Sequence, residues 1–214
     1  YSISSGQTTT ANITAKSLTV SGITASDKIY DGSTSATLTG TAVYSGLVSG
    51  DIFTGSYTGV FANANVGTGK TVTITPSYSG ADVNNYTVTD QSSTTADISA
   101  KALTATASAS NKTYDGGTTA STTLTFTGLV GTETLGQTVG STFDNKNVGS
   151  NKTVTVNSIT LADGSGLAAN YSISAGQTTT ANIIAKSLTV SGITASNKIY
   201  DGNTVATLDP IGVT

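Results

Sequence analysis

Apolar and polar residues alternate with a period of two along most of this chain. The alternation is clear where apolar residues flank Thr, as at 18–20, 72–74 and 154–156. A period of two places successive side chains on opposite faces of a strand, so each run predicts a half-buried strand. The 3.6-residue period that is typical of a helix is missing from the sequence. The pattern therefore predicts an all-β protein.

The alternating runs belong to a longer repeat. Residues 1–38 return almost unchanged at 171–208, and a weaker copy lies between them at 85–116. Equivalent lysines follow one another at intervals of 85 residues: Lys16, Lys101 and Lys186. Similarity at a fixed period indicates an array of one structural unit rather than a single asymmetric domain.

The period divides the chain into four parts. We assign residues 1–16 to the end of a preceding repeat, 17–101 and 102–186 to two complete repeats, and 187–214 to the start of a following repeat. This division predicts that the chain is a window of a longer repetitive protein. A unit of 85 residues can bury one modest core, and contacts with its neighbours would add to its stability.

One complete repeat contains seven alternating runs, bounded by Gly, Asn and Asp. They predict strands at 17–24, 35–39, 43–48, 53–61, 70–76, 85–89 and 94–99. Seven short strands in 85 residues are typical of an antiparallel β-sandwich of immunoglobulin-like size, although the Cys–Trp–Cys pattern of true immunoglobulin domains is missing. We therefore expect tandem immunoglobulin-like sandwich repeats that form an elongated array.

The run at 53–61 carries an aromatic pattern. Phe53, Tyr57 and Phe61 fall on one face of the predicted strand, with Gly55 and Gly59 between them. Glycine inside a strand marks a bend or a close approach of another group. The pattern predicts either a bend here or close packing against a neighbour.

The join between repeats has no Pro or Gly and reads ISAKAL at 98–103. Ile98 and Leu103 are an odd number of positions apart, so one flat strand would place them on opposite faces. If both belong to cores, the chain must turn over or bulge between them. The sequence predicts a short, stiff, twisted junction at 100–101 rather than a flexible linker.

Composition narrows the class of function. Charged residues make up 10% of the chain, the net charge is −3, and every cation is Lys. A slightly acidic chain without Arg is a poor nucleic-acid binder. No apolar run reaches the length of a membrane span. The absence of Cys excludes disulfide bonds and fits a secreted bacterial protein.

A Tyr-Asp-Gly triplet follows an Asn/Asp-Lys pair three times. We interpret it as a turn in which Asp accepts a hydrogen bond from the backbone, Gly takes a positive φ and Tyr closes the end of the sandwich. The nine residues are Tyr30, Asp31, Gly32, Tyr114, Asp115, Gly116, Tyr200, Asp201 and Gly202.

The alternative is that the three aspartates Asp31, Asp115 and Asp201 bind a metal, with calcium the best candidate because it prefers oxygen ligands. Nearby acidic positions lose their charge between copies: Asp27 corresponds to Asn111, and Asp97 corresponds to Asn182. A site that loses charge in this way would bind a cation weakly. We therefore expect no cofactor and keep calcium as the alternative.

Asn-Val-Gly-x-x-Lys-Thr-Val-Thr, at 65–73 and 147–155, superficially resembles a phosphate-binding loop. It lacks the full Gly-x4-Gly-Lys-Ser/Thr spacing and a following helix, so we interpret it as a loop that enters a strand. The chain has no His and no Cys, and its single Glu, Glu133, has no counterpart of its own type in the first repeat. The usual general bases and thiol nucleophiles are therefore missing, and we expect no enzymatic activity.

The ordered motifs Lys-x-Leu-Thr, Tyr-Asp-Gly, Asn-Val-Gly-x-x-Lys-Thr-Val, Asn-Tyr and Thr-Ala-x-Ile resemble YDG-type repeats. Such repeats occur in very large bacterial exoproteins of the filamentous-haemagglutinin and adhesin type. The resemblance implies a β-rich module that is secreted or displayed on the bacterial cell surface. It supplies neither a catalytic residue nor a ligand.

Three functions follow from the repeat and the resemblance. The first is a structural stalk or spacer, whose partners are the neighbouring repeats of the same chain. The second is a binding module whose loop residues contact glycans or a host protein. The third is a self-assembling extracellular fibre or matrix, in which weakly charged edge strands pair between chains.

Overall fold

The computed structural model describes residue 1 and residues 5–210. It divides into two compact units that do not coincide with the repeats. Unit 1 comprises residues 1–106, 125–138 and 159–175, and unit 2 comprises residues 107–124, 139–158 and 176–214. Unit 1 therefore contains the first repeat together with two segments of the second.

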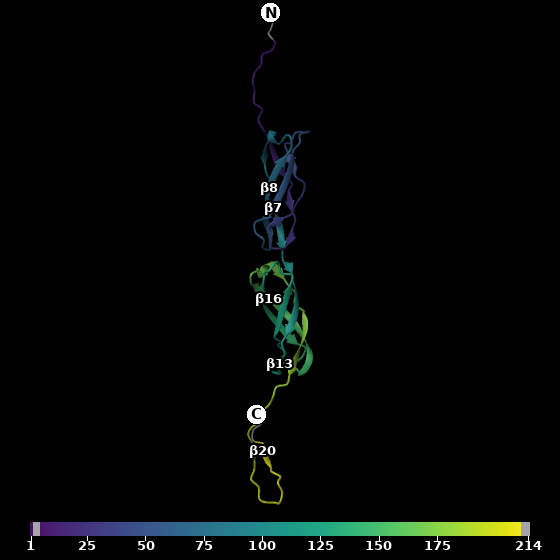
Figure 1. Cartoon of the computed structure of the whole chain (residues 1–214), viewed down its shortest axis with the longest axis vertical. Coiled ribbons are helices and arrows are strands. Elements are labelled where there is room, and N and C mark those ends of the chain that lie inside the picture. The colour runs from purple at the N-terminus through teal and green to yellow at the C-terminus, as the bar shows by residue number, and fades with distance from the viewer. Residues whose placement is uncertain (2–4, 211–214) are drawn as a thin grey trace. The chain divides into compact units, whose positions relative to one another are not determined.

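The prediction of an all-β chain is confirmed, since the described residues contain many strands and only two short 3-10 helices. The first repeat has a strand at each of the seven predicted places (Figure 1). Its elements are β1 (Lys16–Ser21), β2 (Thr24–Ala25), β3 (Lys28–Ile29), β4 (Ser35–Ala36), β5 (Leu38–Thr39), β6 (Val43–Ser45), β7 (Thr54–Phe61), β8 (Gly67–Ser79), η1 (Val83–Asn85), β9 (Tyr86–Thr89) and β10 (Ser93–Ser99). The alternation did not predict β3, and β8 is longer than expected at both ends.

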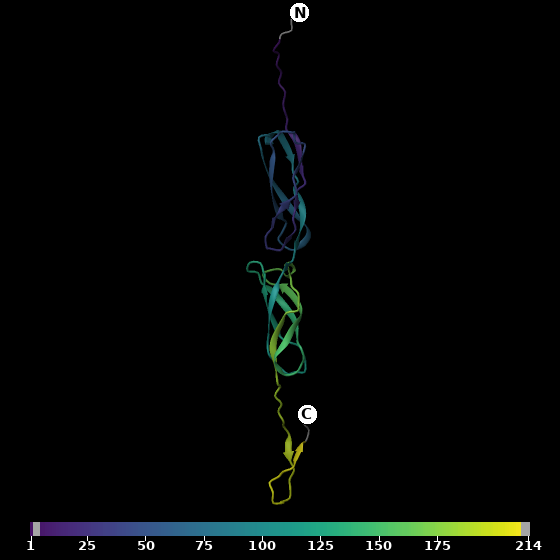
Figure 2. The same ribbon diagram turned by 90° about the vertical axis from the view of Figure 1, so that its right-hand side faces the viewer.

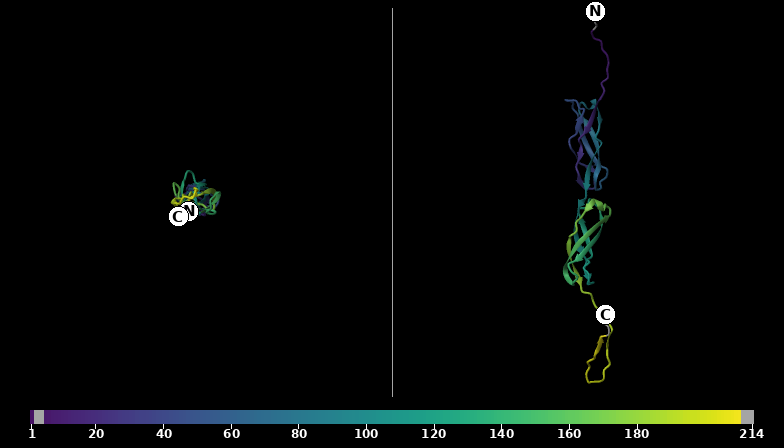
Figure 3. Two further views of the ribbon diagram at one scale, coloured as in Figure 1. Left: turned by 90° about the horizontal axis from the view of Figure 1, so that it is seen from below. Right: turned by 180° about the vertical axis from the view of Figure 1, so that it is seen from behind.

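The remaining strands repeat this order. They are β11 (Lys101–Ala102), β12 (Thr104–Ala109), β13 (Lys112–Thr113), β14 (Thr122–Thr127), β15 (Leu135–Phe143), β16 (Gly149–Asp163), η2 (Ala168–Asn170), β17 (Tyr171–Ser172), β18 (Thr178–Ile184), β19 (Ile193–Ala195) and β20 (Leu208–Pro210). The last two pair as an antiparallel hairpin, yellow in Figure 3. No helix among the described residues is long and apolar enough to span a membrane.

Two main sheets build the first repeat. One has the strand order β6-β1-β9 and the other β3-β10-β8-β7-β4. The long strands β7 and β8 run side by side and antiparallel from Thr54, opposite Ser79, to Phe61, opposite Val72 (Figure 2). The first residues of the second repeat follow the same plan, with sheets β13-β18-β16-β15, β12-β14 and β11-β17.

The prediction of purely antiparallel sheets is wrong for the outer pairs. Strand β1 pairs with β9 in parallel, and β10 pairs with β3 in parallel. The same holds for β11 with β17 and for β13 with β18. The reason is that the opening strand of a repeat and its two closing strands run in the same direction, so pairs between them must be parallel.

Side chains from both sheets of the first repeat meet in the core. One cluster joins Leu18 of β1 and Tyr86 of β9 to Phe53, and a second joins Val20 of β1 to Ile74 of β8. Alternate positions of each strand supply these residues, as the period of two predicted. The core of the second repeat in unit 2 is smaller and centres on Phe143, Val154, Ala181 and Ile183.

The aromatic face of β7 has the predicted orientation, with Phe53 and Phe61 buried and Tyr57 partly buried. The glycines between them accommodate close packing inside the repeat. A Cβ at Gly55 would lie 2.6 Å from the Tyr44 hydroxyl, and one at Gly59 would lie 2.7 Å from Leu38. The neighbours that require these glycines are therefore strands of the same repeat.

The join between the repeats breaks where the sequence predicted. Strand β10 ends at Ser99 and β11 begins at Lys101, so Ala100 separates two strands in different sheets. Ile98 and Leu103 are both buried, with 1% and 6% of their surfaces exposed. The change of sheet at Ala100 lets both side chains reach a core despite their odd spacing.

Candidate functional site

Each Tyr-Asp-Gly triplet forms the predicted kind of turn. Asp31 Oδ1 accepts a hydrogen bond of 2.8 Å from the backbone N–H of Ser33, and Gly32 has a φ of +79°. The other two copies repeat both features, with acceptors Asp115 and Asp201 and φ values of +83° at Gly116 and +74° at Gly202. Glycine is favoured there because a Cβ is strained at positive φ.

The lysine that precedes each triplet holds the turn closed, a role that sequence reasoning missed. Lys28 Nζ lies 2.7 Å from Asp31 Oδ1 and donates to the carbonyl oxygens of Ser33 and Ser35 at 2.9 and 3.2 Å. It also lies over the ring of Phe61, 5.7 Å from the centroid. The signal was present in the sequence, because Asn/Asp-Lys precedes every copy of the triplet.

These ion pairs occupy the carboxylates that were the alternative calcium ligands. A hydrogen bond from Lys28 holds the pKa of Asp31 below its usual value, and Lys112 and Lys198 do the same for Asp115 and Asp201. Among the residues that the structure describes, no three His, Cys, Asp or Glu side chains gather as a metal site would require. The geometry therefore gives the three aspartates a role in the turn.

The acidic positions that become Asn in the second repeat act only as acceptors. Asp27 accepts the N–H of Asp97, which in turn accepts the N–H of Gly69, both at 2.7 Å. In the second repeat Asn111 and Asn182 accept the corresponding bonds at 2.7 and 2.8 Å. Because an amide oxygen accepts as a carboxylate does, the exchange preserves the loop without its charge.

The Asn-Val-Gly motif enters a strand, as the sequence predicted. Strand β8 begins at Gly67 and β16 at Gly149, and each lysine of the motif lies within its strand. Lys70 Nζ bonds the side chain of Asn63 at 2.7 Å, and Lys152 bonds Asn145 at the same distance. The lysines therefore tie the loop down and do not face an open phosphate cradle.

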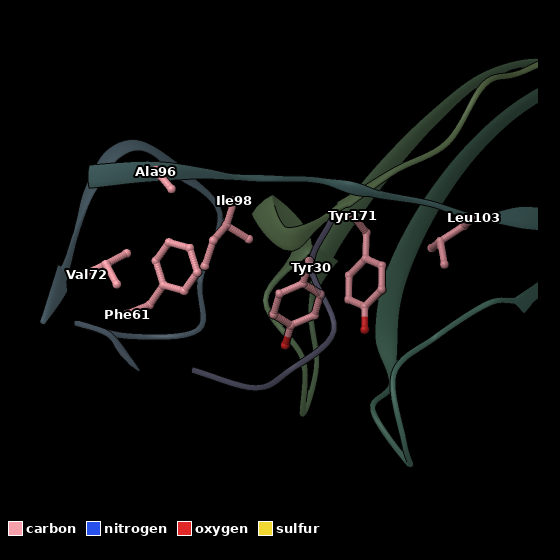
Figure 4. Packing of buried hydrophobic residues seen from close by; sticks show 7 residues of the cluster. All are labelled: Tyr30, Phe61, Val72, Ala96, Ile98, Leu103 and Tyr171. Atoms are coloured by element: carbon pink, nitrogen blue, oxygen red, sulfur yellow. The ribbon is translucent and has the colours of Figure 1, made fainter. Parts of the chain in front are cut away.

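The end of the first repeat is covered by residues of the second, and both belong to unit 1. The Tyr30 hydroxyl donates to Glu133 Oε1 at 2.7 Å, and the Tyr171 hydroxyl donates to Glu133 Oε2 at 2.6 Å. The two rings meet edge to face with centroids 5.4 Å apart, and their hydroxyls lie on the same side (Figure 4). One carboxylate thus bridges a tyrosine of each repeat.

The bridge changes the acidity of both tyrosines. The hydrogen bond to Glu133, together with burial, raises the pKa of Tyr30 to about 12. Burial and the same carboxylate also raise the pKa of Tyr171. Both effects favour the neutral phenol, which is the form that can donate to the carboxylate.

A second polar contact lies beside the bridge. Asn170, with 2% of its surface exposed, accepts the backbone N–H of Val66 at 2.9 Å and donates to Asn65 Oδ1 at 3.1 Å. Buried polar groups are stable when they are hydrogen-bonded in this way. The Asn-Val pair of the loop motif therefore contacts the Asn-Tyr motif of the other repeat.

The first repeat carries its own version of the covering surface. Asp51 accepts from Tyr86, whose hydroxyl also receives the N–H of Val48 at 3.0 Å. In the second repeat Glu133 accepts from Tyr171, whose hydroxyl receives the N–H of Val130 at 2.9 Å. Glu133 therefore has a structural counterpart in the first repeat, Asp51, which comparison by residue type alone did not find.

Comparison with known proteins agrees with this repeat. Residues 14–96 and 99–181 each match the YDG domain, so the two matches together cover more than half of the chain. Comparisons with curated proteins and with solved structures found no match. The chain belongs to the YDG domain family, with two tandem copies of the domain.

Proposed function

We propose that this chain is a structural segment, a stalk or spacer in which each repeat is held on the next. The observation that carries the proposal is the polar bridge from Tyr30 through Glu133 to Tyr171, with buried Asn170 beside it. Side-chain contacts of this kind restrict bending at a junction, whereas a flexible linker would have none. Each repeat then acts mainly on its neighbours, as in other repeat proteins.

The proposal includes immunoglobulin-like sandwich repeats in an elongated array. Two sheets with a shared core support the sandwich, and the absence of Gly and Pro from the join supports a stiff array. The resemblance of the ordered motifs to repeats of large bacterial exoproteins supports a place outside the cell or on its surface. The proposed role is mechanical and includes no catalytic step.

The stiffness of the junction can be measured by distances between spin labels. The chain has no Cys, so Thr58→Cys in β7 and Thr153→Cys in β16, both exposed, provide two unique labelling sites. A stiff junction gives a narrow distance distribution. Tyr30→Phe, which removes one bond of the bridge, should broaden it.

The matched control is Asp51→Ala. It removes the counterpart of Glu133 at the other end of the first repeat, so it should leave the distance distribution unchanged. Small-angle scattering gives a second measurement, because a compact globule of this length has a radius of gyration of about 17 Å. A broad distribution in the unaltered chain, or a radius of gyration near that value, would contradict the stalk.

A further inference from the structure

The closing end of the second repeat has a surface like the one that is covered in the first. An open, largely apolar hollow of about 340 Å³ is lined there by Tyr114, Val148, Ala185, Lys186 and Leu188. We call these five residues the closing surface. Val148 is 53% exposed and Leu188 is 86% exposed, so the surface is not filled by the chain around it.

The first repeat shows what fits such a surface. Tyr30, Val66 and Leu103 occupy the positions of Tyr114, Val148 and Leu188 in the repeat. There Tyr30 and Leu103 are buried, with 5% and 6% exposed, and Val66 is partly buried. The covering residues are Glu133, Asn170 and Tyr171, which reach them through the hydrogen bonds of the bridge.

The chain also carries an uncovered copy of those covering residues. Asp51, Asn85 and Tyr86 of the first repeat occupy the positions of Glu133, Asn170 and Tyr171, and we call them the opening surface. Asn85 is exposed, whereas Asn170 is 2% exposed. Asp51 binds Tyr86 through Oδ2, which leaves Oδ1 in the role that Glu133 Oε1 plays toward Tyr30.

We propose that the closing surface of one copy binds the opening surface of a second copy. Tyr114 would donate to Asp51, and the N–H of Val148 would donate to the side chain of Asn85, as their counterparts do inside the chain. Lys186 on the closing surface and Asp51 on the opening surface have opposite charges. The two surfaces differ, so the contact is heterologous and forms open, head-to-tail chains.

This inference rests on the proposed structural function and adds its partner, which is the chain itself. It also predicts the strength of the contact. Asp51 is one methylene shorter than Glu133, so its carboxylate reaches less far toward Tyr114 than Glu133 reaches toward Tyr30. Association between copies should therefore be weak, and Asp51→Glu should strengthen it.

Sedimentation equilibrium of the 214-residue chain up to about 1 mM tests the contact. The unaltered chain should associate with increasing concentration. Tyr114→Phe should raise the dissociation constant about tenfold, because it removes a hydrogen bond to a charged group. Val148→Asp should abolish association, and Asp51→Glu should lower the dissociation constant. The matched control is Val190→Asp, since Val190 is 65% exposed and lies outside the closing surface.

A mixing experiment tests the head-to-tail geometry. Val148→Asp inactivates the closing surface and Asp51→Lys inactivates the opening surface, so neither variant should associate alone. Their mixture should form heterodimers and nothing larger, because only one competent pair of surfaces remains. Circular dichroism of each variant checks that it is folded.

Two results would overturn the inference. The first is association that survives Val148→Asp and is lost in Val190→Asp, which would assign the contact to strand pairing by the segment after the second repeat. The second is a chain that stays monomeric at about 1 mM. A narrow spin-label distribution in such a monomer would leave the proposed stalk intact, whereas a broad distribution in an associating chain would contradict the stalk alone.

Discussion

The three copies of the Tyr-Asp-Gly turn have almost the same local geometry and very different surroundings. Tyr30 is 5% exposed, Tyr114 is partly buried, and Tyr200 is 92% exposed. All three turns have the same aspartate acceptor and the same lysine ion pair. The difference shows that local sequence forms the turn, whereas the residues packed against it determine whether the tyrosine is buried.

The end of the first repeat and the opening end provide the same contrast for Asn170 and Asn85. Asn170→Asp should destabilise the chain by about 3 kcal/mol or more, because it places a charge in a buried position and removes the donor to Asn65. Asn85→Asp, at the exposed equivalent, should change stability by less than about 0.5 kcal/mol. Chemical denaturation of both variants measures the difference, and equal effects would contradict the assignment of Asn170 to a structural contact.

The glycines of the turns separate backbone strain from packing. Gly116→Val should cost about 1–3 kcal/mol from positive φ alone, since no atom lies within 4 Å of a Cβ there. Gly32→Val should cost more, because its Cβ would also lie 2.9 Å from Val130 of the second repeat. Thermal unfolding compares the two variants. A smaller loss for Gly32→Val would show that Val130 does not restrict this position.

The hydroxyl of Tyr30 can be tested against that of Tyr114. Tyr30→Phe should destabilise the chain by about 1.5–3 kcal/mol, because the hydroxyl donates to the Glu133 carboxylate. Tyr114→Phe should have an effect below about 0.5 kcal/mol in dilute solution, where copies are separate. Urea denaturation at low protein concentration makes the comparison. A large loss for Tyr114→Phe in the monomer would remove the contrast.

The raised pKa of Tyr30 predicts a change in stability at high pH. The folded chain has a pKa of about 12 for Tyr30, above the value of about 10 in the unfolded chain. The folded state therefore keeps the proton longer, and this contribution is present below pH 10 and is lost as the pH rises toward 12. Tyr57 and Tyr78 also have raised pKa values, so the measurement is the difference between the unaltered chain and Tyr30→Phe. That difference should shrink between pH 10 and pH 12.

The smallest expected effect concerns metal. The aspartates of all three turns are paired with lysine, so a chelator should leave the melting temperature unchanged in covered and uncovered turns alike. Calorimetry with EDTA and with added calcium makes the test. A clear drop with EDTA that calcium reverses would assign calcium to Asp31 and Asp115, because a ligand that binds only the folded state stabilises it.

Several features were predictable because they depend on neighbours in the sequence. Alternating residues predicted strands, and the glycine of each triplet predicted a positive φ. The pairing of Lys28 with Asp31 was equally local, three residues apart, but the alternation of apolar residues carries no information about it. The parallel pairs of β1 with β9 and of β10 with β3 were missed, because strand direction depends on how the whole repeat is threaded.

The sequence by itself determined the repeat, the all-β class, the turns and the break at Ala100, since periodicity and glycine placement act over a few residues. Only the tertiary structure showed that Glu133 bridges Tyr30 and Tyr171 and that Asp51 is its counterpart. Tyr30 and Glu133 are 103 residues apart, and no local pattern specifies a contact at that separation. The physical reason is that burial of a polar group depends on whether a distant partner is present to accept or donate its hydrogen bonds.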